Sequence, residues 1–70
     1  MQSIDLHGVK HGDVQDIVMD ACFKLKVPFI VITGKSAQMK RIVRFAVKKF
    51  GLETREEWGN PGRVIVYEDR

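Results

Sequence analysis

The spacing of apolar residues in two segments is the feature that most constrains the fold of this chain. In each segment, apolar side chains recur at offsets of 0, 3, 4, 7, 8 and 11 residues, which places them along one stripe of an α-helix. The two stripes consist of Val14, Ile17, Val18, Ala21, Cys22 and Leu25, and of Met39, Ile42, Val43, Ala46, Val47 and Phe50. Each helix has to bury its stripe against a second layer of structure.

Short β-type runs precede the two helices. Ser3 to His7 alternates apolar and polar residues, the pattern of a strand covered on one face, which places Asp5 and His7 on the same side. Phe29 to Thr33 is a continuous β-branched and aromatic run, which predicts a central strand buried on both faces.

Residues that favour helix ends mark where each helix begins and stops. Asp13 is placed to cap the first helix, and Pro28 ends it. Ser36 is placed to cap the second helix, and Gly51 follows it as a left-handed C-terminal residue.

The end of the chain predicts two further strands, Leu52 to Glu57 and Arg63 to Tyr67, joined by a loop over Trp58 to Gly62. The predicted order is β-α-β-α-β-β. Because crossovers between parallel strands are right-handed, both helices are expected on one face of the sheet. We therefore predict one domain over residues 1–70, an α/β two-layer sandwich with a four-stranded mixed sheet. Its other sheet face would stay uncovered unless a second copy or a partner protein packed on it.

Positive charge is segregated in the chain, whose net charge is +3. Between Asp20 and Glu53 there is no acidic residue but eight basic ones: Lys24, Lys26, Lys35, Lys40, Arg41, Arg44, Lys48 and Lys49. On the second helix, cations recur one turn apart, a row that can follow a phosphate backbone and bind it without sequence preference.

An acidic row on the first helix could instead pair with the positive charge of the second helix. Asp13, Asp16 and Asp20 can form salt bridges with the basic helix or with a partner. In that case the chain would be a protein-interaction adaptor.

Asp5 and His7 are candidates for proton transfer. Histidine titrates near neutral pH, and a nearby carboxylate can orient its ring, so the pair can act as general acid and base on a hydroxyl or water. Alternatively, His7 caps the following turn and Asp5 binds a loop amide. Together with His11 they define no metal-ligand set, so we expect neither a metal nor a cofactor.

Thr33-Gly34-Lys35-Ser36 ends like a phosphate-binding loop for nucleoside triphosphates. Such a loop also needs a glycine five residues before Gly34, where this chain has Phe29. We therefore expect no nucleotide site. Gly34 and the helix start can still contact a backbone phosphate with Lys35 supplying charge, or Gly34 serves the tight turn alone.

Trp58 and Arg63 flank the Gly-Asn-Pro-Gly segment. An exposed tryptophan can stack on an unpaired base, and arginine can pair with a phosphate. A tryptophan packed against the core is the alternative, and Asn60 is typical of a turn.

These motifs and their order resemble the small MutS-related (Smr) domain over roughly residues 4–67. The family's Asp-x-His motif, its Thr-Gly corner and its glycine-rich hairpin fall on Asp5 and His7, on Thr33 and Gly34, and on Gly59 and Gly62. The resemblance implies nucleic-acid binding, and many members nick DNA or cleave RNA.

The chain departs from the family pattern where Ser36 and Gln38 replace later glycines of the second motif and where the hairpin has fewer glycines. We therefore expect a cytoplasmic, Smr-like endonuclease for DNA or RNA, without membrane contact, or else an inactive nucleic-acid-binding module of the same fold. The expected catalytic residues are Asp5 and His7. The expected nucleic-acid contacts are Thr33, Gly34, Lys35, Lys40, Arg41, Arg44, Gly59, Asn60, Gly62 and Arg63.

Overall fold

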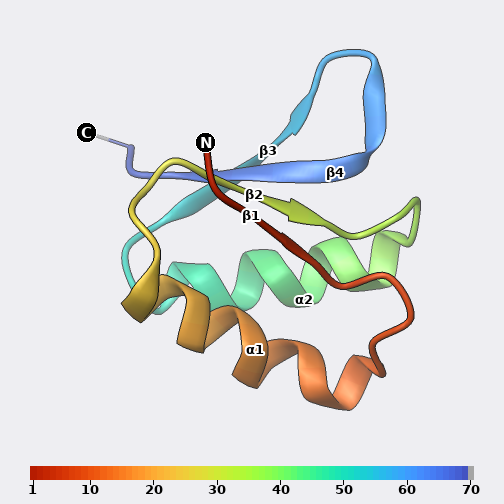
Figure 1. Ribbon diagram of the computed structural model, residues 1–70, viewed down its shortest axis with the longest axis horizontal. Helices are drawn as coiled ribbons and strands as arrows, with labels where there is room; N and C mark the ends of the chain where they lie inside the picture. The colour runs from red at the N-terminus through yellow and green to blue at the C-terminus, as the bar shows by residue number, and fades with distance from the viewer. Residues whose placement is uncertain (70) are drawn as a thin grey trace.

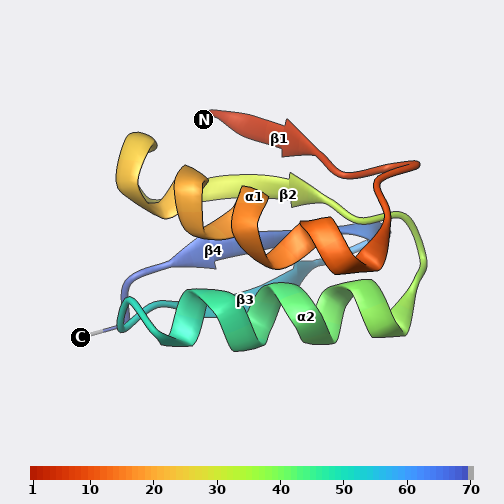
Figure 2. The ribbon, with the colours of Figure 1, turned by 90° about the horizontal axis from the view of Figure 1, so that it is seen from below.

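The structure, a computed structural model, describes residues 1–69. The elements follow in the predicted order: β1 (Ser3–Asp5), α1 (His11–Lys24), β2 (Phe29–Ile32), α2 (Ala37–Lys48), β3 (Glu53–Glu57) and β4 (Asn60–Tyr67). Both helices lie on one face of the sheet and run side by side (Figures 1 and 2). The α/β two-layer fold predicted from the sequence is confirmed.

The four strands form one mixed sheet in the order β1-β2-β4-β3. β1 is parallel to β2, and β4 is antiparallel to both of its neighbours, β2 and β3. β1, β2 and β3 therefore point the same way. Because β1 and β2 are parallel, the loops that leave them open at the same edge of the sheet.

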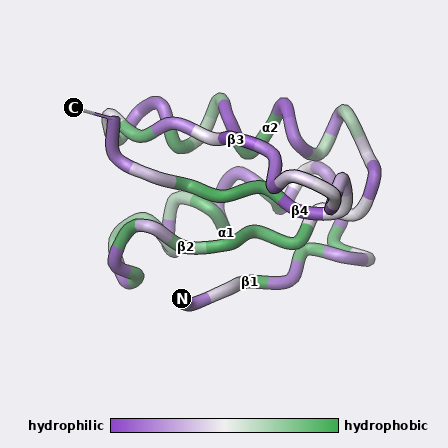
Figure 3. The backbone as a smooth tube through the Cα atoms, turned by 90° about the horizontal axis from the view of Figure 1, so that it is seen from above, coloured by the Kyte–Doolittle hydropathy of each residue, from purple (hydrophilic) through white to green (hydrophobic). Residues whose placement is uncertain are grey.

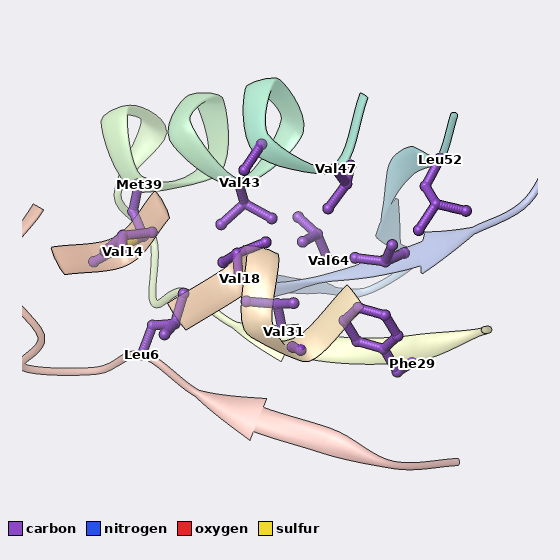
Figure 4. Close-up of a cluster of buried hydrophobic side chains, with 13 residues drawn as sticks. Leu6, Val14, Val18, Phe29, Val31, Met39, Val43, Val47, Leu52 and Val64 are labelled. Carbon is purple, nitrogen blue, oxygen red and sulfur yellow. The ribbon is translucent and has the colours of Figure 1, made fainter. Parts of the chain in front are cut away.

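The hydrophobic core lies between the sheet and the helices (Figure 4). On β2, Phe29 and Val31 face the helices and are fully buried. They pack in one cluster with Val18 of α1 and with Val43 and Val47 of α2. The helical stripes predicted from spacing are thus the faces that the protein buries, except that Ile17 of α1 is exposed.

The opposite face of the sheet has no helix over it. Ile30 and Ile32 of β2 alternate with the buried residues and are only partly buried. In Figure 3, which looks onto this side, hydrophobic residues follow the central strands β2 and β4, whereas β3 is hydrophilic. The prediction of a strand buried on both faces is therefore wrong, because only one face of the sheet is covered by a second layer.

The structure corrects the start of one helix and confirms the ends of the other. α1 begins before Asp13, with Lys10 as its N-cap and no side-chain hydrogen bond there. The Ser36 Oγ accepts a 3.0 Å hydrogen bond from the Met39 amide, the capping bond expected for α2. Gly51 has a φ of 73° after α2, also as expected. Within residues 1–69, neither helix has the length and apolar character needed to cross a membrane.

The β3–β4 connection is shorter than predicted. Glu57 pairs with Asn60, so the turn contains only Trp58 and Gly59, and Asn60 to Gly62 belong to β4. Gly59 has a φ of 77°, a conformation that glycine adopts without strain and that permits so tight a turn. The hairpin rises from the sheet on the side away from the helices (Figure 1).

Candidate nucleic-acid interface

Three segments far apart in the sequence meet at one edge of the sheet. The Gly62 carbonyl oxygen accepts hydrogen bonds from the amides of Thr33 (3.1 Å) and Gly34 (2.9 Å). The Leu6 amide donates to the Ile32 carbonyl oxygen at 2.9 Å, which holds the end of β1 beside the end of β2. The β1–α1 loop, the β2–α2 corner and the start of β4 therefore form one continuous surface.

Asp5 and His7 lie on this edge, but not as two residues of one strand. β1 ends at Asp5, and the chain turns so that one carboxylate oxygen, Asp5 Oδ1, accepts a 2.8 Å hydrogen bond from the His7 backbone amide. The prediction that Asp5 and His7 share one face of a strand is wrong, because this bond bends the backbone into a turn. Among residues 1–69, the Asp5 carboxylate makes no hydrogen bond to the imidazole, and both side chains are exposed.

The polar groups of the Thr33–Gly34 corner form hydrogen bonds within the protein. Thr33 is 3% exposed, and its hydroxyl donates a 2.7 Å hydrogen bond to the Gly34 carbonyl oxygen. Gly34 has a φ of 68°, and its amide is taken by Gly62. Lys35, the next residue, is exposed. At this corner, Lys35 is thus the side chain that a phosphate can reach.

A groove of about 370 Å³ lies between α2 and β3. Its lining residues are Ala37, Lys40, Arg41, Arg44, Thr54, Arg55, Glu56 and Val64. The structure therefore brings together three of the cations predicted to bind nucleic acid. It adds Arg55, which the sequence did not single out because its position beside α2 depends on the order of the strands.

The three predicted cations of the groove differ in availability. Lys40 Nζ lies 2.6 Å from a Glu56 carboxylate oxygen, and its side chain is 18% exposed. Arg41 and Arg44 are exposed, and neither has an ion-pair partner among residues 1–69. Arg41 and Arg44 are therefore the groups best placed to meet an anion in the groove.

The acidic row of α1 does not neutralise the basic face of α2. In the part of the chain that the structure describes, Asp20 pairs with Lys24 of its own helix, and no ion pair joins α1 to α2. The two helices pack through apolar side chains instead.

The remaining predicted contacts lie on the hairpin. Asn60 Oδ1 accepts a 3.2 Å hydrogen bond from the Gly62 amide, and Arg63 Nε donates to the Glu57 carboxylate. Gly59 forms the turn with Trp58, which is 99% exposed. The alternative that this tryptophan packs against the core is wrong.

The structure also bears on thiol chemistry and on metal binding. Cys22 is partly buried against the core, and burial raises the pKa of its thiol, which favours the unreactive neutral form. Among residues 1–69, no three His, Cys, Asp or Glu side chains converge in a way that would hold a metal ion.

Comparisons with protein-family models, curated proteins and solved structures each returned no match. The function is therefore inferred from the residues of the site.

Proposed function

We propose that the chain is an Smr-like domain that binds DNA or RNA along α2 and the adjoining edge of the sheet. The observation that carries this proposal is the pair of exposed guanidinium groups, Arg41 and Arg44, on the wall of the groove between α2 and β3. Cations in such a groove attract the phosphate backbone and displace its counterions, which gives affinity without sequence preference.

The free cations of α2 support nucleic-acid binding. Among residues 1–69, Arg41 and Arg44 have no ion-pair partner and can meet an external phosphate. Asp13 and Asp16 of α1 also have no ion-pair partner there, so the adaptor role stays the alternative. Lys35 extends the positive surface to the edge where the β2–α2 corner lies.

Replacement of both Arg41 and Arg44 by glutamine tests the groove. We expect weaker binding to a labelled oligonucleotide, with the slope of log affinity against log salt concentration reduced by roughly one for each lost contact. The matched control replaces Lys24 and Lys26 by glutamine. This removes the same charge from the end of α1 and the connection to β2, where no contact is proposed.

The two double variants separate the possible outcomes. Equal losses would mean that net charge alone drives binding, which contradicts a site on α2. If the unmodified protein does not bind DNA or RNA even at low salt, the nucleic-acid proposal is wrong and the adaptor role is favoured.

A second proposed function is cleavage of the bound phosphodiester. It is supported by the position of His7, whose imidazole is exposed at the same edge of the sheet as Lys35. The Asp5 carboxylate accepts a hydrogen bond from the His7 backbone amide and so holds this residue in place. His7 would accept the proton of an attacking 2′-hydroxyl or water as the attacking oxygen bonds to phosphorus. The bond from phosphorus to the leaving oxygen then breaks, and that oxygen takes a proton from the imidazolium or from solvent water. Asp5 would position His7 through its backbone amide.

His7→Ala should lower the rate of cleavage by about a hundredfold or more, the usual contribution of a general acid or base. His11→Ala is the matched control, because this second exposed histidine begins α1 and has no assigned role. Asp5→Asn should keep most of the activity, since an amide oxygen can still accept the His7 N–H, whereas Asp5→Ala should not. Cleavage that is unchanged in His7→Ala would exclude His7 as the proton carrier.

A further inference from the structure

Trp58 is the most exposed large hydrophobic residue of the described chain, at 99%. The other exposed aromatic side chains have neighbours: Phe23 meets the Phe50 ring edge-on at 5.0 Å, and Lys49 lies 5.0 Å from the centre of the Phe45 ring. Within residues 1–69, Trp58 makes no ring contact or side-chain hydrogen bond. Its indole therefore contributes no burial to folding, although it is among the side chains that gain most from burial.

The hairpin that carries Trp58 has contacts that link its base to the rest of the protein. The Asn60 Oδ1 bond to the Gly62 amide and the ion pair of Arg63 with Glu57 brace its base. Gly62 in turn accepts hydrogen bonds from the β2–α2 corner. These bonds constrain the backbone that carries the indole at the edge of the proposed interface, and a constrained backbone loses less entropy on binding.

The acidic residues before Trp58 do not leave a negative tip on the hairpin. Glu56 is paired with Lys40 at 2.6 Å, and Glu57 is paired with Arg63. Each carboxylate has a cation beside it, so repulsion of an approaching phosphate is offset.

The surroundings of Trp58 adjoin the basic groove. A second hollow of about 360 Å³ is lined by Glu56, Glu57, Trp58, Gly59, Asn60 and Pro61. Glu56 also lines the groove that contains Arg41 and Arg44. A strand whose backbone lies on those arginines can therefore continue toward the indole.

We propose that Trp58 is a stacking platform for an unpaired base, and that the domain consequently prefers nucleic acid with unpaired bases to continuous duplex. This inference rests on the proposed nucleic-acid binding. A base in a duplex is already stacked on both sides, whereas an unpaired base can place its face on an aromatic ring.

The neighbours of Trp58 favour a base over the other partners that use exposed tryptophan. Among the residues that line the hollow, Pro61 is the only apolar neighbour of the indole, and insertion into a membrane or a protein pocket relies on a larger apolar patch. Stacking on a base needs only one ring face and a nearby contact for the backbone.

Trp58 is the chain's single tryptophan, so its intrinsic fluorescence reports on this site alone. We expect oligothymidylate of about 12 nucleotides to quench it and a blunt duplex of equal length not to. Trp58→Ala should weaken single-strand binding about tenfold and leave duplex binding unchanged, with Trp58→Phe between the two. Phe23→Ala is the control, because this exposed aromatic residue lies near the end of α1, away from the hairpin.

The outcomes distinguish a failure of the Trp58 stacking role from a failure of nucleic-acid binding itself. Binding of both oligonucleotides with equal affinity and no quenching would overturn the role of Trp58 and leave nucleic-acid binding intact. Failure to bind either one would overturn nucleic-acid binding itself. A fluorescence change with anionic phospholipid vesicles, but not with oligothymidylate, would assign Trp58 to a membrane surface instead.

Discussion

At the scale of single residues, the carbonyl oxygen of Gly62 joins the hairpin to the corner after β2. It accepts the amides of Thr33 and Gly34, and the Thr33 hydroxyl lies 3.4 Å from it while donating to the Gly34 carbonyl oxygen. Polar groups buried in this way have to be satisfied within the protein, because water cannot reach them. We therefore expect the Thr33 side chain to stabilise the corner, and not to be one of the predicted nucleic-acid contacts.

Thr33→Val tests this role, because valine keeps the shape of the side chain but loses the hydroxyl. We expect the free energy of unfolding to fall by about 1 kcal/mol, the usual contribution of one hydrogen bond, with unchanged affinity for oligonucleotides. Urea denaturation and a binding titration measure the two effects, and Thr33→Ser should preserve the hydrogen bond. Weakened binding at unchanged stability would instead place Thr33 in the interface.

At the scale of elements, the two helices begin at the same edge of the sheet but are capped differently (Figure 2). Ser36 caps α2 with its hydroxyl, whereas Lys10 precedes α1 in extended conformation and makes no side-chain capping bond. A lysine there also places positive charge at the positive end of the helix dipole.

Lys10→Ser should therefore raise the free energy of unfolding by about 1 kcal/mol, because serine can accept an amide hydrogen bond at the start of α1. Ser36→Ala provides the reverse comparison and should lower stability by about the same amount. Both follow from urea denaturation at neutral pH. A loss of stability in Lys10→Ser would show that the lysine side chain supports the loop in another way.

At the scale of the whole molecule, the two faces of the sheet differ in whether a second layer covers them. The helices cover one face, while Ile30 and Ile32 remain half-buried on the other, so packing by a second copy or a partner protein stays a prediction. The edge strand β3 is rich in charge, which discourages edge-to-edge pairing with other chains. The surfaces that carry exposed groups able to bind a ligand are therefore the α2 groove, with its arginines, and the hairpin, with Trp58.

Much of the fold was predictable because helix and strand periodicities are local properties of the chain. The apolar offsets identified both helical faces, and the Ser36 cap marked the start of α2. The site was only partly predictable. Arg41 and Arg44 were found from charge spacing, but Arg55 joins them through strand order, and the hairpin turn proved shorter than its glycines and proline implied.

The sequence by itself determined the element order, the buried helical faces and the segregation of positive charge, since each follows from residues close together in the chain. Only the tertiary structure decided which polar groups are already engaged and which are free to act. It showed that Asp5 holds the His7 backbone, that Gly62 occupies the Gly34 amide, and that the Trp58 ring is left in solvent. Contacts between distant segments decide these points, because such contacts depend on how the strands are ordered and where the backbone turns.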